Sequence, residues 1–174
     1  MTEKKINGKT IRLIKGDLTD LDVDAFTFYA TEDLALGSGY GTAITIRGGP
    51  KIQEELQTLA PVSMGDAVVS AAGELKADYI IHAVGPKFQE EDEEGKLRKA
   101  MTSSLKKAEE KGIKRLAFPP MGSGFYGIPV DLCARVMLET IKEHLSGSTP
   151  LDEIIICTPD TREMNPFASK LETL

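Results

Sequence analysis

The 174-residue sequence has no tryptophan, only two cysteines and two histidines, and no long apolar run. A membrane helix needs about 20 consecutive apolar residues, so we expect no membrane partner. Cys133, Cys157, His82 and His144 show none of the spacings typical of zinc ligands, so we expect neither a metal nor a cofactor. Free thiols and the lack of an apolar segment after the charged amino terminus favour a cytoplasmic location.

Positive charge is also scarce. Lys and Arg number 21 against 27 Asp and Glu, which leaves a net charge of −6. Because duplex nucleic acid is bound by clustered Lys and Arg, we expect no generic nucleic-acid binding. An apolar fraction of 41% with mixed charge excludes intrinsic disorder. The length fits one domain, so we expect residues 1–174 to fold as a single unit.

Apolar periodicity alternates between strand and helix along the chain. Six short segments are predicted strands because they are rich in apolar or β-branched residues and bounded by Gly, Pro or Asp: 11–15, 23–29, 66–71, 79–84, 115–118 and 153–158. Apolar residues three and four apart predict helices over 95–111 and 129–145, with weaker signals over 40–46, 50–59 and 163–171. This alternation predicts an α/β fold with helices on both faces of a mostly parallel sheet.

Two glycine-rich loops each follow a predicted strand and precede a predicted helix. One spans 30–43 (ATEDLALGSGYGTA) and the other 117–129 (AFPPMGSGFYGIP). Such a loop directs backbone N–H groups towards one point near the positive end of a helix, which suits a phosphate. A tight turn in which glycine only relieves strain gives the same pattern. Ligands of open α/β sheets bind at the carboxyl ends of the strands, so the loops are predicted to share a site.

Neither loop contains a cationic side chain. No Lys or Arg occurs between residues 24 and 46 or between 116 and 134, and the nearest cations in sequence are Arg47, Arg115 and Arg135. An anion at this site would therefore be held by backbone amides and hydroxyl groups.

Several short motifs follow one another over residues 11–167. They are GDLT at 16–19 with VDA at 23–25, IHAVGP at 81–86, AFP at 117–119 and GSGFYG at 122–127. In this order and separation they resemble the macro domain family, whose members bind ADP-ribose. The resemblance implies a three-layer α/β/α sandwich around a mixed, mostly parallel six-stranded sheet.

The resemblance also implies roles for particular residues. Asp17 would accept a hydrogen bond from the adenine amino group and the Leu18 amide would touch the ring, although an Asp that caps a turn is the alternative. The distal ribose and diphosphate would be lined by Gly37, Ser38 and Gly39. The diphosphate would be wrapped by the second loop, through Gly122, Ser123, Gly124 and Phe125, with Tyr126 near the distal ribose. Tyr29 and Tyr40 flank the first loop, and each would either stack on a sugar or base or pack in the core.

The sequence departs from the family pattern at three places. Thr31 replaces the last Asn of an Asn-Ala-Ala-Asn motif, where it would still contact the distal ribose. Residues 40–42 lack the Asp that hydrolytic members carry after the glycines, and Pro159 stands where many members place an aromatic ring over adenine. A base could come from Glu32 or Asp33 if the loop folds inward, but solvent exposure is the commoner fate.

Three hypotheses about function follow. The first is a module that binds ADP-ribose, a related adenine diphosphate nucleotide or an ADP-ribosylated protein. The departures favour this hypothesis or the third below over catalysis, and the intact GSGFYG motif with Asp17 favours it over the third. The second is a hydrolase acting on ADP-ribosylated protein or O-acetyl-ADP-ribose by a route without the usual Asn and Asp. The third is an interaction domain with a degenerate pocket. No residue is assigned as catalytic, since His82 lies in an apolar strand and is expected to be packed and hydrogen-bonded.

Overall fold

The computed structural model describes residues 2–174, with Phe125 described by its backbone alone. The strands are β1 (Glu3–Ile6), β2 (Lys9–Lys15), β3 (Ala25–Ala30), β4 (Ala67–Ala71), β5 (Tyr79–Val84), β6 (Arg115–Phe118) and β7 (Glu153–Thr158). The helices are α1 (Tyr40–Gly48), α2 (Lys51–Leu59), α3 (Glu93–Glu110), α4 (Val130–Leu145) and α5 (Thr161–Glu172), with short 3₁₀ turns η1 (Leu18–Asp20) and η2 (Gly124–Tyr126). None of these helices is long and apolar enough to cross a membrane.

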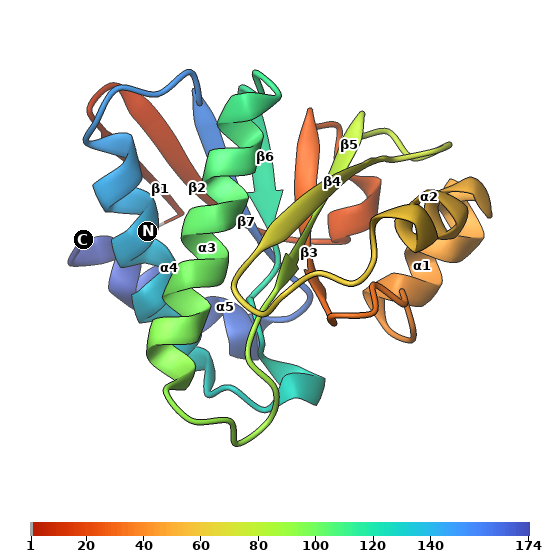
Figure 1. The fold of residues 1–174 in the computed structure, drawn as a ribbon. Helices are drawn as coiled ribbons and strands as arrows, with labels where there is room; N and C mark the ends of the chain where they lie inside the picture. Colours follow the sequence, from red (N-terminus) through yellow and green to blue (C-terminus); the bar gives the residue numbers. More distant parts are fainter. Residues whose placement is uncertain (1) are drawn as a thin grey trace.

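The strands form one mixed sheet in the order β1-β2-β7-β6-β3-β5-β4 (Figure 1). The five central strands run parallel, and the edge strands β1 and β4 pair antiparallel to their neighbours. The α/β class, the three layers and the mixed, mostly parallel sheet are as expected, but the sheet has seven strands rather than six.

The additional strand is β1, which the apolar pattern did not predict. Its sequence Glu-Lys-Lys-Ile alternates between exposed and half-buried positions at the sheet edge, so it carries no apolar signal. Asn7 and Gly8, with φ of 53° and 80°, join it to β2. An Asn-Gly pair with two positive φ values is the preferred two-residue hairpin connection, and this was the available signal for the strand.

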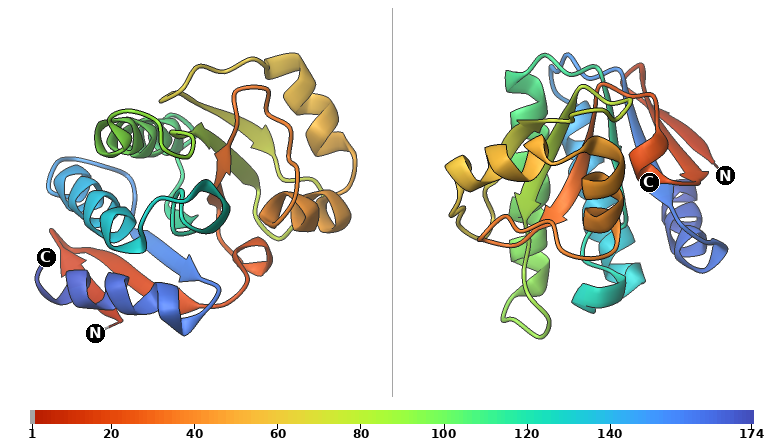
Figure 2. Two further views of the ribbon diagram at one scale, coloured as in Figure 1. Left: turned by 90° about the horizontal axis from the view of Figure 1, so that it is seen from below. Right: turned by 90° about the vertical axis from the view of Figure 1, so that its right-hand side faces the viewer.

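Helices cover both faces of the sheet, as the apolar runs predict. Figure 2 shows α3 and α4 on the side opposite α1 and α2. Alternate residues of β7 point to the two cores: Ile154 and Ile156 pack with α3, α4 and α5, whereas Ile155 and Cys157 pack with α1 and α2. Because β3 is covered on both faces, all six of its residues are buried.

The parallel register brings several strand ends to one edge of the sheet. Ala30 pairs with Val84 at the ends of β3 and β5, and Phe118 pairs with Ile156 near the ends of β6 and β7. The loops after β3 and β6 therefore leave the sheet on the same side, at its lower edge in Figure 1.

Candidate ligand-binding site

A cavity of about 450 Å³ opens at this edge of the sheet. Both glycine-rich loops contribute to its wall, together with the end of β3 and the start of α5. The lining residues are Phe28, Tyr29, Thr31, Asp33, Ala35, Leu36, Gly37, Ser38, Gly39, Tyr40, Pro119, Pro120, Gly122, Ser123, Gly124, Tyr126, Pro159 and Glu163. The structure thus brings together nine of the twelve residues predicted to bind ligand: Thr31, Gly37, Ser38, Gly39, Tyr40, Gly122, Ser123, Gly124 and Tyr126.

The first loop is held by α2 and by its own glycines. Gln53 of α2 accepts a hydrogen bond from Leu36 N at 2.9 Å and donates one to Leu34 O at 3.1 Å. Gly37 and Gly39 have φ of 65° and 63°, a conformation that costs glycine little. A Cβ at Gly41 would lie 1.7 Å from Leu36 O, so the loop leaves no room for a side chain there. This contact excludes a carboxylate side chain at position 41.

The second loop turns sharply between β6 and α4. Gly122 has a φ of 85°, which favours glycine. A Cβ on this residue would also lie 2.4 Å from Ile128 Cδ1, so the turn requires glycine here. Ser123 Oγ donates a hydrogen bond to Glu163 Oε1 at 3.0 Å and so connects the loop to α5. The loop and the start of α5 therefore form one continuous wall of the cavity.

Two aromatic rings and the Asp33 carboxylate also line the cavity. The rings of Tyr29 and Tyr126 are 4.6 Å apart between centroids, and Tyr29 Oη donates a hydrogen bond to Pro86 O. Thr31 Oγ1 donates to Asp33 Oδ1 at 2.6 Å, and this bond and one from Ala35 N lower the pKa of Asp33. Asp33 is exposed but lines the cavity, whereas the neighbouring Glu32 is not among the described lining residues and its carboxylate lies 4.0 Å from Lys87 Nζ.

Asp17 and Leu18 lie outside the cavity lining. Asp17 is the N-cap of η1: its Oδ1 accepts hydrogen bonds from Thr19 N at 3.0 Å and Thr19 Oγ1 at 2.7 Å. Burial raises the pKa of Asp17, but the hydrogen bonds from Thr19 and Arg47 outweigh it and leave the pKa below its ordinary value. The Leu18 side chain is fully buried in the core with α1 and α2. The turn-capping interpretation of Asp17 is thus correct, while its contact with adenine stays a prediction.

The lining carries negative charge only. Asp33 and Glu163 are acidic, and none of the described lining residues is Lys or Arg. The cations nearest in sequence are engaged elsewhere: Arg47 with Asp17, Arg115 with Glu153 and Arg135 with Glu94. An anionic ligand would therefore rely on backbone amides and hydroxyl groups.

No histidine or cysteine is among the described residues that line the cavity. His82 is buried and its Nε2 is 2.8 Å from Ser70 Oγ, which confirms the expectation of a packed, hydrogen-bonded histidine. Burial lowers the pKa of His82 to about 3. Cys133 and Cys157 are buried free thiols, and burial raises their pKa values to about 12 and about 11.

Glu163 was not predicted as part of the site. The sequence places an acidic residue three positions after Asp160, a spacing typical of a capping box, and Asp160 does cap α5 by accepting from Glu163 N at 2.8 Å. In a capping box the Glu side chain would return to the cap residue, but here its carboxylate accepts from Ser123. A local pattern could not reveal a partner forty residues earlier in the chain.

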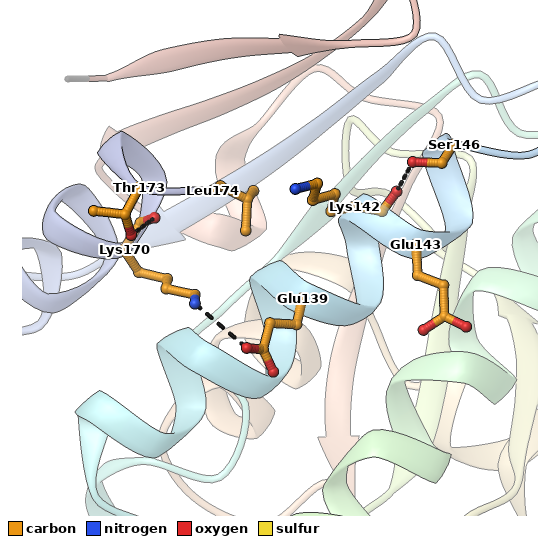
Figure 3. A pocket seen from close by; sticks show the side chains of 7 residues that line it. All are labelled: Glu139, Lys142, Glu143, Ser146, Lys170, Thr173 and Leu174. Carbon is orange, nitrogen blue, oxygen red and sulfur yellow. Dashed lines mark hydrogen bonds and ion pairs between the residues drawn. The ribbon is translucent and has the colours of Figure 1, made fainter.

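A second hollow lies between α4 and α5, where these helices end (Figure 3). It is lined by charged and polar side chains, and Lys170 Nζ lies 3.4 Å from Glu139 Oε2 across it. A helix that follows a parallel strand runs antiparallel to that strand. The ends of α4 and α5, and the hollow between them, therefore lie at the edge of the sheet where the parallel strands begin. It contains none of the glycine-rich residues and is separate from the site described above.

Comparison with known proteins agrees with this architecture. The sequence model of the macro domain matches residues 29–137. A macro domain-containing protein of Caldanaerobacter subterraneus is 38% identical over 170 residues, which cover 94% of this chain and 97% of that protein. The O-acetyl-ADP-ribose deacetylase 1 of Pantoea vagans is 35% identical, over 86% of this chain and 91% of that protein. The chain therefore belongs to the macro domain family.

Solved macrodomains share the fold closely. The Oceanobacillus iheyensis macrodomain with ADP superposes with a TM-score of 0.93 at 23% identity, over 99% of this chain and 95% of that one. The Trypanosoma brucei macrodomain in complex with ADP-ribose gives a TM-score of 0.87 at 26% identity, over 92% of this chain and 68% of that one.

Proposed function

We propose that this chain binds ADP-ribose, or a related adenine diphosphate nucleotide, in the cavity between the two glycine-rich loops. The observation that carries the proposal is that both loops border one cavity at the carboxyl ends of β3 and β6. Family membership and the relatives that bind ADP-ribose or ADP, or bear the name of an O-acetyl-ADP-ribose deacetylase, support the same ligand class.

Within this proposal, each part of the ligand is assigned to particular residues around the cavity. Backbone N–H groups of the second loop (Gly122, Ser123, Gly124, Phe125) and of Gly37, Ser38 and Gly39 face the diphosphate. Thr31 and Tyr126 are placed at the distal ribose, and Asp17, Leu18 and Tyr40 at the adenosine half. A hydroxyl at Thr31 offers one donor, whereas the amide of Asn offers both a donor and an acceptor, so we expect weaker distal-ribose binding than in Asn-containing members.

Isothermal titration calorimetry with ADP-ribose, ADP, AMP and ribose 5-phosphate tests the proposal. We expect ADP-ribose and ADP to bind more tightly than AMP, because the single phosphate of AMP cannot contact the backbone N–H groups of both loops. The absence of detectable heat with millimolar ADP-ribose would overturn the proposal and favour an interaction domain without a working pocket. ADP-ribosylated protein as the physiological partner is then tested by pull-down with a modified and an unmodified protein.

Asp33 favours hydrolysis as a second candidate function, because its carboxylate lines the cavity and is ionised at neutral pH. In deacetylation of O-acetyl-ADP-ribose, a water oxygen would bond to the acetyl carbon while the ester C–O bond breaks. Asp33 would accept the water proton and return it to the ribose oxygen, and acetic acid would leave and lose its own proton to solvent to become acetate. A lowered pKa makes Asp33 a weak base, so we expect slow turnover. Acetate release that is unchanged in Asp33→Asn would exclude this role, and hydrolysis of ADP-ribosylated protein is tested in the same way.

A further inference from the structure

Two residues on the cavity wall, Tyr40 and Glu163, each have a side-chain oxygen without a hydrogen-bond partner among the described residues, and for Tyr40 this oxygen is buried. Tyr40 Oη, at the start of α1, is buried and has no hydrogen-bond partner among residues 2–174. Burial also raises the pKa of Tyr40, so the group remains a neutral hydroxyl that can donate and accept. A buried hydroxyl without a partner costs free energy, which a bound ligand could recover.

Glu163, at the start of α5, is the second group. The residue is 6% exposed and lines the cavity. Its Oε1 accepts the hydrogen bond from Ser123 Oγ, and no described residue donates to its Oε2. An ionised carboxylate only accepts hydrogen bonds, so Oε2 fits a ligand that donates an O–H or N–H. Phosphate oxygens that are ionised at neutral pH cannot do so.

Both groups belong to the part of the cavity wall formed by the starts of α1 and α5. Tyr40 packs against the core cluster that contains Leu18 of η1 and Cys157 of β7, and Glu163 lies in the first turn of α5, which follows β7. Tyr126, by contrast, lies against the ring of Tyr29 and packs with the other core cluster. The side with Tyr40 and Glu163 is therefore the side assigned to the adenosine half of the ligand.

We propose that Tyr40 and Glu163 form a subsite for the two neighbouring hydroxyls of the adenosine ribose. One hydroxyl donates to Glu163 Oε2 and the other pairs with Tyr40 Oη, so the two unmatched groups are satisfied together. Because a phosphate on either hydroxyl would face the Glu163 carboxylate, the subsite excludes nucleotides phosphorylated there. The inference rests on the proposed function and adds to it a selectivity for unmodified ribose.

Calorimetry with ADP-ribose and ADP-ribose 2′-phosphate tests this subsite. We expect the wild-type chain to prefer ADP-ribose at least tenfold. The 2′-phosphate is repelled by the Glu163 carboxylate, and it also replaces the hydroxyl that donates a hydrogen bond to Glu163. In Glu163→Gln the affinity for ADP-ribose should fall about fivefold and the preference should shrink, because the repulsion is removed. Glu143→Gln, an exposed site on α4 with the same change in charge, is the matched control and should change neither value.

Tyr40→Phe provides an independent test. We expect about fivefold weaker binding of ADP-ribose because Oη is lost. The same variant should melt at a higher temperature without ligand, since it removes a buried hydroxyl that has no partner. Weaker binding together with a more stable free protein distinguishes a ligand contact from a structural role.

The outcomes separate this inference from the proposed function. Glu163→Gln that binds ADP-ribose more tightly, with an unchanged preference, would show that Glu163 only repels the diphosphate beside Ser123 and would overturn the subsite. Tyr40→Phe with unchanged affinity would remove Tyr40 from it. A wild-type chain that binds ADP-ribose without preferring it to the 2′-phosphate refutes the subsite alone, whereas a chain that binds neither refutes both proposals.

Discussion

Arg47 Nη1 lies 2.5 Å from Asp17 Oδ2, so the last turn of α1 holds the carboxylate that begins η1. The Asp17 side chain is still 41% exposed, which leaves room for a further donor. If that donor is the adenine amino group, Asp17→Ala should weaken binding of ADP-ribose about fivefold, because one hydrogen bond to a charged group is lost. Binding of ribose 5-phosphate should be nearly unchanged.

Calorimetry on Asp17→Ala measures both ligands, with Arg47→Ala as the control. Arg47→Ala removes the ion pair but keeps the carboxylate and its cap bonds to Thr19. It should therefore retain the affinity for ADP-ribose. Equal weakening of both ligands by Asp17→Ala would assign its effect to the lost cap of η1 and not to adenine.

Gly124 offers a test of the diphosphate site. Its φ is 68° and no atom lies within 4 Å of the position of a Cβ, so a side chain has space but the backbone is strained. Gly124→Ala carries this strain alone and should weaken ADP-ribose binding less than threefold. Gly124→Glu adds negative charge beside the diphosphate in a lining without cations, and we expect a loss of more than tenfold. Similar losses in both variants, or equal drops in melting temperature, would indicate a backbone effect only.

The absence of cations from the lining predicts a weak dependence on salt. Between 0.05 and 0.5 M NaCl we expect the Kd for ADP-ribose to change less than threefold, since amide donors are not screened as mobile cationic side chains are. A modest gain in affinity would fit screening of Asp33 and Glu163. A loss of tenfold or more, measured by calorimetry, would mean that Lys or Arg contacts the diphosphate.

Buried His82 predicts how stability depends on pH. Its pKa is about 3 in the folded protein and near 6.5 in an unfolded chain, so between these values the unfolded state binds more protons. Its contribution is present in full above pH 6.5 and is lost as the pH falls. From pH 6.5 to 5 the free energy of unfolding should drop by about 2 kcal/mol through this residue.

Urea unfolding of wild type and His82→Gln measures this effect. Gln stays neutral and its amide can still bond to Ser70, so the variant should show a flatter curve over the same pH window. Acids with lowered pKa values, such as Asp17 and Asp33, affect both proteins equally and mainly below pH 4. Parallel curves would mean that His82 is protonated without cost in the folded state.

The elements predicted from sequence are those with an apolar face. The five helices and the six strands with apolar patterns all form, with bounds shifted by one or two residues at most places. The strand β1 was missed because its Glu-Lys-Lys-Ile sequence buries little at the sheet edge. The local signal that marks it is the Asn7-Gly8 hairpin and not hydrophobicity.

The sequence by itself determined the α/β alternation, the two glycine-rich loops and the lack of cations within them, because these depend on residue type and local spacing. Only the tertiary structure decided that Glu163 contacts Ser123, that the Tyr40 hydroxyl is buried with no partner in the described part of the chain, and that Asp17 lies outside the lining. Periodicity shows which face of an element is buried, but not what it faces. The strand order places β2 beside β7, more than a hundred residues away, and brings β6 beside β3, and that order sets the chemistry of the cavity.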